Sequence, residues 1–186
     1  MRNTAALIIF IFSLSMSIAQ INSNQELINC VDGKTVKLAN SRTLGVVLVF
    51  MSNQCPHATY YVDRLMSLEA ELDSEKIKFF LVNAYSAKEE SVAQMKEYAS
   101  THKLGTYLVD KEQQLKKALG VRKSPEAVLL KRNGDQLIKF YQGPIDNNPQ
   151  VATDVSETYL KNNIDRLLSN QTGVKSSMPV VGCFIK

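Results

Sequence analysis

The chain has 186 residues, enough for one well-buried domain, and its 22 Lys and Arg against 18 Asp and Glu give a formal net charge of +4. The basic residues are interleaved with acidic ones and form no one-signed stripe with aromatic side chains, so we set nucleic-acid binding aside. The 3 cysteines are too few for a disulfide scaffold, and an odd number leaves at least one thiol unpaired within a monomer.

Residues 1–19 have the layout of a secretory signal peptide. A basic residue precedes the apolar run Ala5–Met16, and small residues follow it, which predicts cleavage before Gln20. A membrane anchor is the alternative, but the apolar run is too short to span a bilayer comfortably, and no second hydrophobic segment follows. We therefore expect residues 20–186 to form an exported domain, secreted or periplasmic, without stable membrane insertion.

The first half of this domain is expected to alternate strands with helices. Hydrophobic periodicity and turn residues predict a β-hairpin around Asp32-Gly33, a buried strand at Gly45–Phe50, a helix with Tyr61, Leu65, Leu68 and Leu72 on its buried face, a strand at Ile77–Tyr85, and a helix with Val92, Met95 and Ala99 inward. The alternating order favours parallel strands joined by right-handed crossovers.

The second half changes character, because a tight turn joins two of its strands. We predict a short strand at 106–110, a short helix closed by Gly120, two strands joined at Asn133-Gly134, a helix over Val155–Leu168 with Leu160, Ile164, Leu167 and Leu168 buried, and a tail over 171–186. The tight turn makes its two strands antiparallel. The expected fold class is therefore α/β, with a central mixed β-sheet flanked by helices and an N-terminal β-hairpin.

Cys55 stands where the predicted strand Gly45–Phe50 runs into the first helix, in the stretch "SNQCPHATYYVDRL". That junction lies at the carboxyl edge of the sheet, where α/β proteins place their sites, and Pro56 suits the first helical turn. The unpaired N–H groups and the dipole of that turn favour a thiolate and depress a cysteine pKa below its usual value of about 8.5. The sequence therefore predicts a nucleophile at Cys55, with a buried, inert cysteine as the alternative.

The order of elements, the strand-to-helix cysteine and the stretch "GVRKSPEAVLLKRNG" resemble the thioredoxin superfamily. More narrowly, "FMSNQCPHATYYVDRL", "YLVD", "SPEAVLL", "YQGPIDNNPQ" and "GCFIK" resemble the peroxiredoxin-like redoxins of the alkyl hydroperoxide reductase/thiol-specific antioxidant group. The resemblance covers essentially all of residues 20–186. It implies a thioredoxin-like fold, cysteine redox chemistry and a cis-proline at Pro125 opposite Cys55, but it does not name the substrate.

The sequence also departs from both relatives at the site. Thioredoxins carry a Cys-x-x-Cys pair, and the first of those positions is Ser52 here. Read as "SNQC", the stretch resembles the Thr/Ser-x-x-Cys of peroxiredoxins, whose hydroxyl hydrogen-bonds the thiolate or the peroxide. Peroxiredoxins have a proline four positions before that hydroxyl, and Leu48 stands there instead. The peroxidase interpretation is weakened accordingly.

Two further residues could take part in the chemistry. Cys183 is either a resolving thiol that condenses with a sulfenic acid on Cys55, or a structural cysteine in a tail that docks by its apolar residues. Arg122, three residues before Pro125, is close enough in the expected fold to stabilise a thiolate by charge, unless it is a solvated surface residue. Cys30 is expected to be a small buried residue rather than a catalyst.

We expect an exported thiol-dependent redoxin with peroxidase-like activity, which takes a peroxide or disulfide substrate and an external thiol reductant. No cofactor is expected, and 2 histidines without paired-cysteine spacing argue against a metal site. One alternative is a thiol-disulfide oxidoreductase acting on proteins, which the lack of a second nearby cysteine disfavours. The other is a non-enzymatic thioredoxin-fold module that holds an extended peptide beside Pro125, which the helix-terminal cysteine disfavours. The oligomeric state is left open.

Overall fold

The computed structural model of the chain describes residues 20–86 and 90–186, so the predicted signal peptide at 1–19 lies outside the described residues. The strands are β1 (Gln20–Asn22), β2 (Glu26–Asn29), β3 (Thr35–Lys37), β4 (Gly45–Phe50), β5 (Ile77–Asn83), β6 (Tyr107–Val109), β7 (Lys123–Ser124), β8 (Glu126–Asn133), β9 (Gln136–Gly143) and β10 (Cys183–Phe184). The helices are α1 (Pro56–Glu71), α2 (Val92–Thr101), α3 (Gln114–Leu119) and α4 (Tyr159–Leu168), with a short 3-10 helix at Ala152–Asp154.

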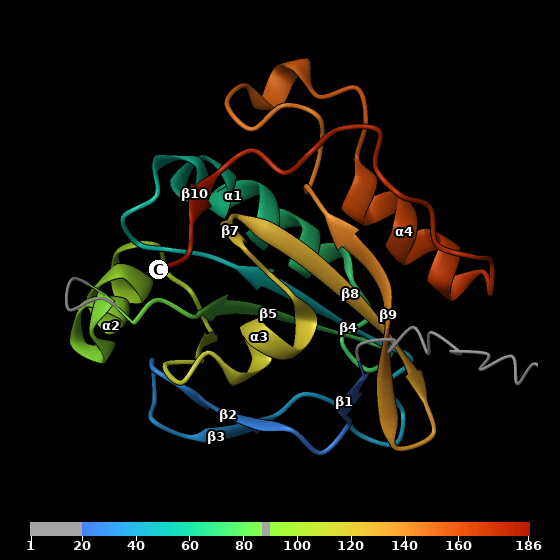
Figure 1. The fold of residues 1–186 in the computed structure, drawn as a ribbon, viewed down its shortest axis with the longest axis horizontal. Helices are drawn as coiled ribbons and strands as arrows, with labels where there is room; N and C mark the ends of the chain where they lie inside the picture. The colour runs from blue at the N-terminus through green and yellow to red at the C-terminus, as the bar shows by residue number, and fades with distance from the viewer. Residues whose placement is uncertain (1–19, 87–89) are drawn as a thin grey trace, which may run out of the picture.

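A mixed, 8-stranded sheet forms the centre of the molecule, in the order β1-β9-β8-β4-β5-β6-β2-β3 (Figure 1). The strands β4, β5 and β6 are parallel, whereas β8 runs antiparallel to β4 and to β9. The strands β2 and β3 pair as the N-terminal hairpin, and Gly33 in their turn has a positive φ of 74° that glycine adopts without strain. The predicted mixed sheet and hairpin are therefore confirmed.

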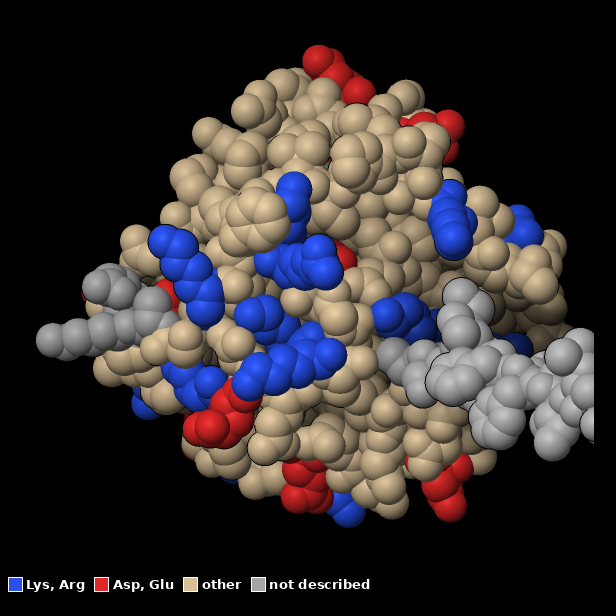
Figure 2. Space-filling model, viewed as in Figure 1, with Lys and Arg blue, Asp and Glu red and all other residues tan. Residues whose placement is uncertain are grey.

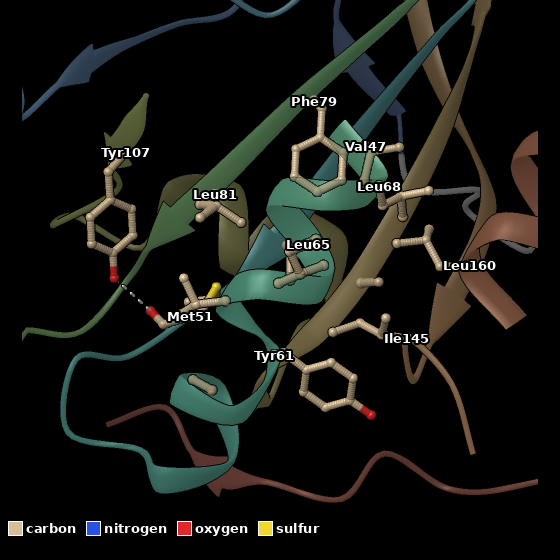
Figure 3. Packing of buried hydrophobic residues seen from close by; sticks show 14 of the residues in the cluster. Val47, Met51, Tyr61, Leu65, Leu68, Phe79, Leu81, Tyr107, Ile145 and Leu160 are labelled. Carbon is tan, nitrogen blue, oxygen red and sulfur yellow. Dashed lines mark hydrogen bonds between the residues drawn. The ribbon is translucent and has the colours of Figure 1, made fainter. Parts of the chain in front are cut away.

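The sheet separates two hydrophobic layers, because successive side chains of a strand point to opposite faces. Along β4, Val47 and Val49 enter one core, while Val46 and Leu48 enter the other. The first core is closed by α1 and α4, and Figure 3 shows their side chains meeting those of β4 and β5. The second core is covered by α3. Strand β4 is thus buried on both faces, as its continuous β-branched run predicts.

Helix α1 begins at the predicted place and positions the site. Cys55 is its N-cap residue and Pro56 its first residue. Its buried stripe includes Tyr61, Leu65 and Leu68, as the sequence predicts, whereas Leu72, the fourth predicted member, is the C-cap residue and is only partly buried. Burial of this stripe fixes the helix against the sheet, so its N-terminus lies at the carboxyl edge of β4. Within the described residues, no helix combines the length and the apolar character that crossing a bilayer requires.

Three details of the helices differ from the sequence-based expectation. Val92 is 45% exposed rather than inward, because it is the first residue of α2 and the buried stripe begins one turn later at Met95. The last helix begins at Tyr159 rather than Val155, after the separate 3-10 turn. Leu168, its final residue, is 42% exposed although Leu167 beside it is 5% exposed, because Leu168 lies just outside the helix face that the buried residues cover.

Candidate functional site

Cys55 and Cys183 are joined in a disulfide, with their Cα atoms 5.9 Å apart and 128 positions between them in sequence. Figure 1 shows the C-terminal strand β10, which carries Cys183, lying beside the start of α1 and against β7. The tail therefore folds back across the carboxyl edge of the sheet. It docks by its own contacts and still brings its sulfur to Cys55, so the two alternatives for Cys183 are compatible with each other.

Cys55 lies in an enclosed position between α1 and the segment that precedes β8. Its side chain is 1% exposed, and its Sγ is 3.1 Å from the carbonyl oxygen of Ser124. The peptide bond from Ser124 to Pro125 is cis, and Pro125 is buried. Cys55, the cis-proline and the start of α1 are thus brought together as the resemblance implies.

The tail docks by strand pairing with β7 and by a close approach of Gly182 to the backbone of Ser124. In the pairing of β10 with β7, Cys183 lies opposite Ser124, and the N–H of Ile185 donates to the carbonyl of Arg122 at 2.9 Å. A Cβ added at Gly182 would lie 2.2 Å from the carbonyl oxygen of Ser124, a separation that real Cβ atoms do not show. Glycine at this position therefore permits the approach that places Cys183 over Cys55.

Side chains of the domain hold the carbonyl groups of the tail. Their hydrogen bonds run from Lys123 Nζ to Val180 O (2.8 Å), Tyr85 Oη to Phe184 O (3.0 Å), Lys116 Nζ to Ile185 O (3.1 Å) and Gln113 Nε2 to Lys186 O (2.9 Å). The Ile185 side chain is only 7% exposed and belongs to the second core. The tail is therefore seated along its length rather than tethered by the disulfide alone.

The hydroxyl of Ser52 forms hydrogen bonds at the turn that precedes α1. It donates to the carboxylate of Glu90 and accepts a hydrogen bond from the N–H of Gln54 at 3.0 Å. Ser52 contacts Cys55 through its main chain, since the Cys55 N–H donates to the Ser52 carbonyl at 3.4 Å. The hydroxyl thus fixes the turn that leads into α1.

Glu90 is the residue of this site that the sequence analysis missed. Its side chain is 1% exposed, and its carboxylate also accepts from the Asn53 N–H at 2.9 Å and from Asn83 Nδ2 at 2.6 Å. A buried carboxylate needs such donors, because an unpaired one is costly. In the sequence Glu90 stands in an acidic, polar stretch beside a helix start, which is typical of solvated residues, so no local signal distinguishes it.

The remaining candidates occupy different settings. Arg122 is exposed one residue before β7, and its described hydrogen bonds are made by its main chain, with Glu126 Oε2 accepting from its N–H at 3.0 Å. Cys30 is a free thiol and 4% exposed, and burial raises its pKa to about 11. In the described part of the chain, no group of three or more His, Cys, Asp or Glu residues is placed to hold a metal ion.

A mixed sheet, a cysteine at a helix N-terminus and a cis-proline beside it are the features of a thioredoxin-like protein. The profile of the AhpC/TSA family matches residues 20–138 of this chain, and the chain belongs to that family. Both the family and the fold are those that the sequence motifs indicate. No curated protein matches the chain significantly.

Solved structures extend the likeness over the whole domain. An uncharacterized conserved protein from Geobacillus kaustophilus is 25% identical, with a TM-score of 0.74 over 93% of this chain and 97% of that one. A hypothetical protein from Sinorhizobium meliloti 1021 is 22% identical, with a TM-score of 0.75 over 92% and 95%. The exposed lipoprotein thioredoxin of Streptococcus pneumoniae is 23% identical, with a TM-score of 0.58 over 76% and 98%. The chain is therefore a thioredoxin-fold thiol redoxin.

Proposed function

We propose that the protein is an exported, peroxidase-like redoxin in which Cys55 is the nucleophile and Cys183 the resolving thiol. The observation that carries this proposal is the pairing of the two sulfurs at the start of α1, beside the cis-proline. A helix N-terminus stabilises a thiolate, and a thiolate is the form of cysteine that reacts. The tail supplies the second thiol that the chemistry requires.

The proposed cycle has three balanced steps. The Cys55 thiolate attacks one peroxide oxygen, the O–O bond breaks, and the other oxygen leaves as an alcohol or water while Cys55 becomes a sulfenic acid. The Cys183 thiol then attacks the Cys55 sulfur, forming the disulfide and releasing water. Finally, an external dithiol reduces the disulfide to two thiols and is itself oxidised to a disulfide. The structure corresponds to the state before this last step.

A peroxide can reach Cys55 only when the tail moves away from its docked position against β7. In the disulfide state Cys55 is 1% exposed, and the Gly182 backbone lies against Ser124. After reduction, only the strand pairing, the Ile185 contacts and the side-chain hydrogen bonds hold the tail. We expect the reduced protein to release the tail transiently, so that peroxide reaches the thiolate.

Mass spectrometry after brief peroxide treatment of the reduced protein tests the cycle. The wild type should form the Cys55–Cys183 disulfide, while Cys183→Ser should accumulate a Cys55 sulfenic acid that dimedone traps. Cys30→Ala serves as the matched control, since its thiol is buried and free. If Cys183→Ser shows no dimedone adduct on Cys55, and the wild type forms no disulfide, the assignment is wrong.

A thiol-disulfide oxidoreductase is the second candidate, and the position of Ser52 favours it. The hydroxyl expected to orient a peroxide donates instead to Glu90. In this alternative, the Cys55 thiolate attacks a protein disulfide, and Cys183 then resolves the mixed disulfide. Ser52→Ala separates the two functions: unchanged peroxide reactivity together with fast reduction of insulin disulfides would favour disulfide exchange. A slower reaction with peroxide would favour the peroxidase.

The proposed export has its own test. Cleavage of the predicted signal would leave Gln20 at the N-terminus, and Gln20 is also the first residue of β1. The full chain, expressed in a bacterial host and fractionated, should yield a mature protein outside the cytoplasm that begins at Gln20. An uncleaved chain in the cytoplasmic fraction would contradict export.

A further inference from the structure

Basic side chains gather on one face of the molecule, over α3, β7 and the neighbouring part of β9. Figure 2 shows this gathering as the largest group of blue atoms on the face in view. We call it the basic face and define it by Lys111, Lys116, Lys117, Arg122, Lys123 and Lys139. The elements are adjacent, since Lys139 Nζ donates to the carbonyl of Leu119 at 2.6 Å.

The cations of the basic face lack ion-pair partners within 20–86 and 90–186. Burial is the main cause that lowers the pKa of Lys116, the charge of Lys117 adds to it, and the nearby Asp110 carboxylate opposes it. Glu112 is an exposed acid in the same segment, whereas Glu126 is buried and accepts from main-chain N–H groups. The β2–β3 hairpin differs, because there Lys34 and Lys37 pair with Asp32 and Glu26. Asp110 is buried beside Lys116, so the six cations of the basic face outnumber Asp110, Glu112 and Glu126 without forming ion pairs with them, and the face carries a net positive charge.

The basic face adjoins the tail that carries Cys183. Lys123 Nζ donates to Val180 O at 2.8 Å and stands 5.3 Å from the centre of the Phe184 ring. Lys116 Nζ donates to Ile185 O at 3.1 Å. A molecule that settles on the basic face therefore arrives next to the disulfide.

The two sulfurs differ in access from solvent. Cys55 is 1% exposed, while Cys183 is half-buried and is followed by Phe184, which is 67% exposed. An incoming thiolate therefore reaches Cys183 first. Attack on Cys183 forms a mixed disulfide and breaks the bond to Cys55, which leaves as a thiolate at the start of α1. This direction follows from the proposed function, in which the start of α1 stabilises the departing Cys55 thiolate, because a more stable thiolate leaves faster.

We propose that the basic face is the docking surface of the protein reductant, a partner with an acidic surface around a reducing dithiol. The proposal rests on the proposed function, because it names the partner of its last step. One partner thiolate attacks Cys183, the second partner thiol then attacks the mixed disulfide, and the partner leaves oxidised while Cys183 regains its thiol. The spread of the cations over α3, β7 and β9 matches a protein surface rather than a single anionic group.

The physical consequence is electrostatic steering of the reductant. Complementary charge raises association rates by about 10- to 1,000-fold, and the effect falls steeply as salt increases. The cations here are exposed or half-buried, so we expect the lower part of that range. The same charge repels cationic reductants.

The test uses the oxidised full-length protein and three dithiol peptides of one length, which carry Glu, Gln or Lys around the same Cys-x-x-Cys. Each reduction rate is divided by the rate of that peptide with neutral hydroxyethyl disulfide, which corrects for thiol reactivity. We expect the Glu peptide to be about tenfold faster than the Gln peptide and the Lys peptide to be slower. The advantage should vanish in about 1 M salt, where the Debye length is about 3 Å.

Charge-reversal variants locate the effect. Lys117→Glu/Arg122→Glu should remove most of the advantage of Glu over Gln, whereas Lys34→Glu/Lys37→Glu, with the same change in net charge, should keep it. Equal rates for the Glu and Gln peptides, or an equal loss in both double variants, would overturn the proposal. So would an advantage of similar size for 2-mercaptoethanesulfonate over 2-mercaptoethanol, because a single small anion would then account for it.

A final measurement identifies the sulfur that is attacked. A peptide with its second cysteine replaced by serine stops at the mixed disulfide, and peptide mapping should find it on Cys183. An adduct on Cys55 would contradict the proposed direction of attack. These measurements start from the preformed disulfide, so they remain valid if peroxide fails to regenerate it, and that failure would count against the proposed function alone.

Discussion

The chain places two buried cysteines in the same core on one side of its sheet, and their surroundings differ. Cys55 is 1% exposed and Cys30 4%, and both belong to the first hydrophobic core. Cys55 is the N-cap residue of α1, beside a cis-proline and a docked tail. Cys30 follows strand β2, its N–H donates to the Tyr107 carbonyl at 2.9 Å, and burial raises its pKa to about 11.

From this contrast we expect burial alone to leave a thiol inert, and reactivity to require both a local electric field and access for the substrate. The start of α1 provides unpaired N–H groups next to Cys55. The tail covers Cys55, and we expect the strand pairing, the hydrogen bonds and the Ile185 contacts that hold it to open while the rest of the core stays folded. Cys30 has neither, so it serves packing.

The largest effect should come from removing each thiol in turn. Cys55→Ser should lower the rate of peroxide consumption by on the order of 1,000-fold or more, because loss of a nucleophile removes the covalent path. Cys30→Ala should leave that rate within about twofold, since Cys30 lies outside the path. Stopped-flow measurement of peroxide loss compares the two. A large loss of activity in Cys30→Ala, with its folding intact, would break the comparison.

The second prediction concerns pH. The pKa of Cys30 is raised from 9.0 to about 11, so folding retains the thiol proton. The stabilisation is complete below about pH 9 and is lost as pH rises from about 9 to about 11, which amounts to about 2.5 kcal/mol. Urea unfolding of the reduced wild type and Cys30→Ala should show their difference shrinking over this interval. A difference that stays constant from pH 8 to pH 11 would contradict the raised pKa.

The third prediction tests the support beneath Cys55. Glu90→Gln keeps only one acceptor oxygen. The Asn53 N–H and the Gln54 N–H use different oxygens of the carboxylate, so one of these two donors would face an amide NH2 group instead of an acceptor. We expect a loss of about 2 kcal/mol in the free energy of unfolding, typical of a buried polar group that loses its partner. Exposed Glu97→Gln is the control with the same change of charge. Equal stability of the two variants would remove Glu90 from the support of the site.

The smallest expected effect concerns the seat of the tail. Gly182→Val cannot place its Cβ beside the carbonyl of Ser124, so β10 should pair poorly with β7. We expect the Cys55–Cys183 disulfide to form about tenfold more slowly after peroxide treatment. The tail would dock against β7 less favourably by about 1.4 kcal/mol, so Cys183 would lie near Cys55 less often. Gly105→Ala, where an added Cβ meets nothing within 4 Å, is the control. Disulfide formation at the wild-type rate in Gly182→Val would show that docking of the tail does not limit the reaction.

Much of the fold is predictable from local pattern. The strand Gly45–Phe50 and the buried stripe of α1 are found at the predicted residues, because a continuous β-branched run and a 3.6-residue period are strong signals. The helix ends are less predictable. Val92 and Leu168 fit the apolar period and are nevertheless exposed, because periodicity does not say where the covering layer stops.

The site is predictable only in part. Cys55 follows from the strand-to-helix junction, and Pro125 from the resemblance. Glu90 does not, because its partner Ser52 is 38 positions away and the pairing arises from the sheet topology. The docking position of the tail is likewise not predictable from the sequence. It depends on the close approach of Gly182 to Ser124 and on lysine side chains that donate to main-chain carbonyls. Contacts between segments distant in sequence leave no periodic trace.

The span of the disulfide gives the site a thermodynamic role in the whole domain. The Cys55–Cys183 link joins residues 128 positions apart, so it restricts most of the unfolded chain. In the chain-entropy description, closing a loop of about 100 residues stabilises the folded state by about 4.7 kcal/mol. By thermodynamic linkage, folding raises the effective concentration of one sulfur at the other. The disulfide is therefore harder to reduce in the folded chain than in the unfolded chain. We therefore expect reduction of this disulfide to leave a less stable domain that is more open to local unfolding, and reoxidation to restore its stability.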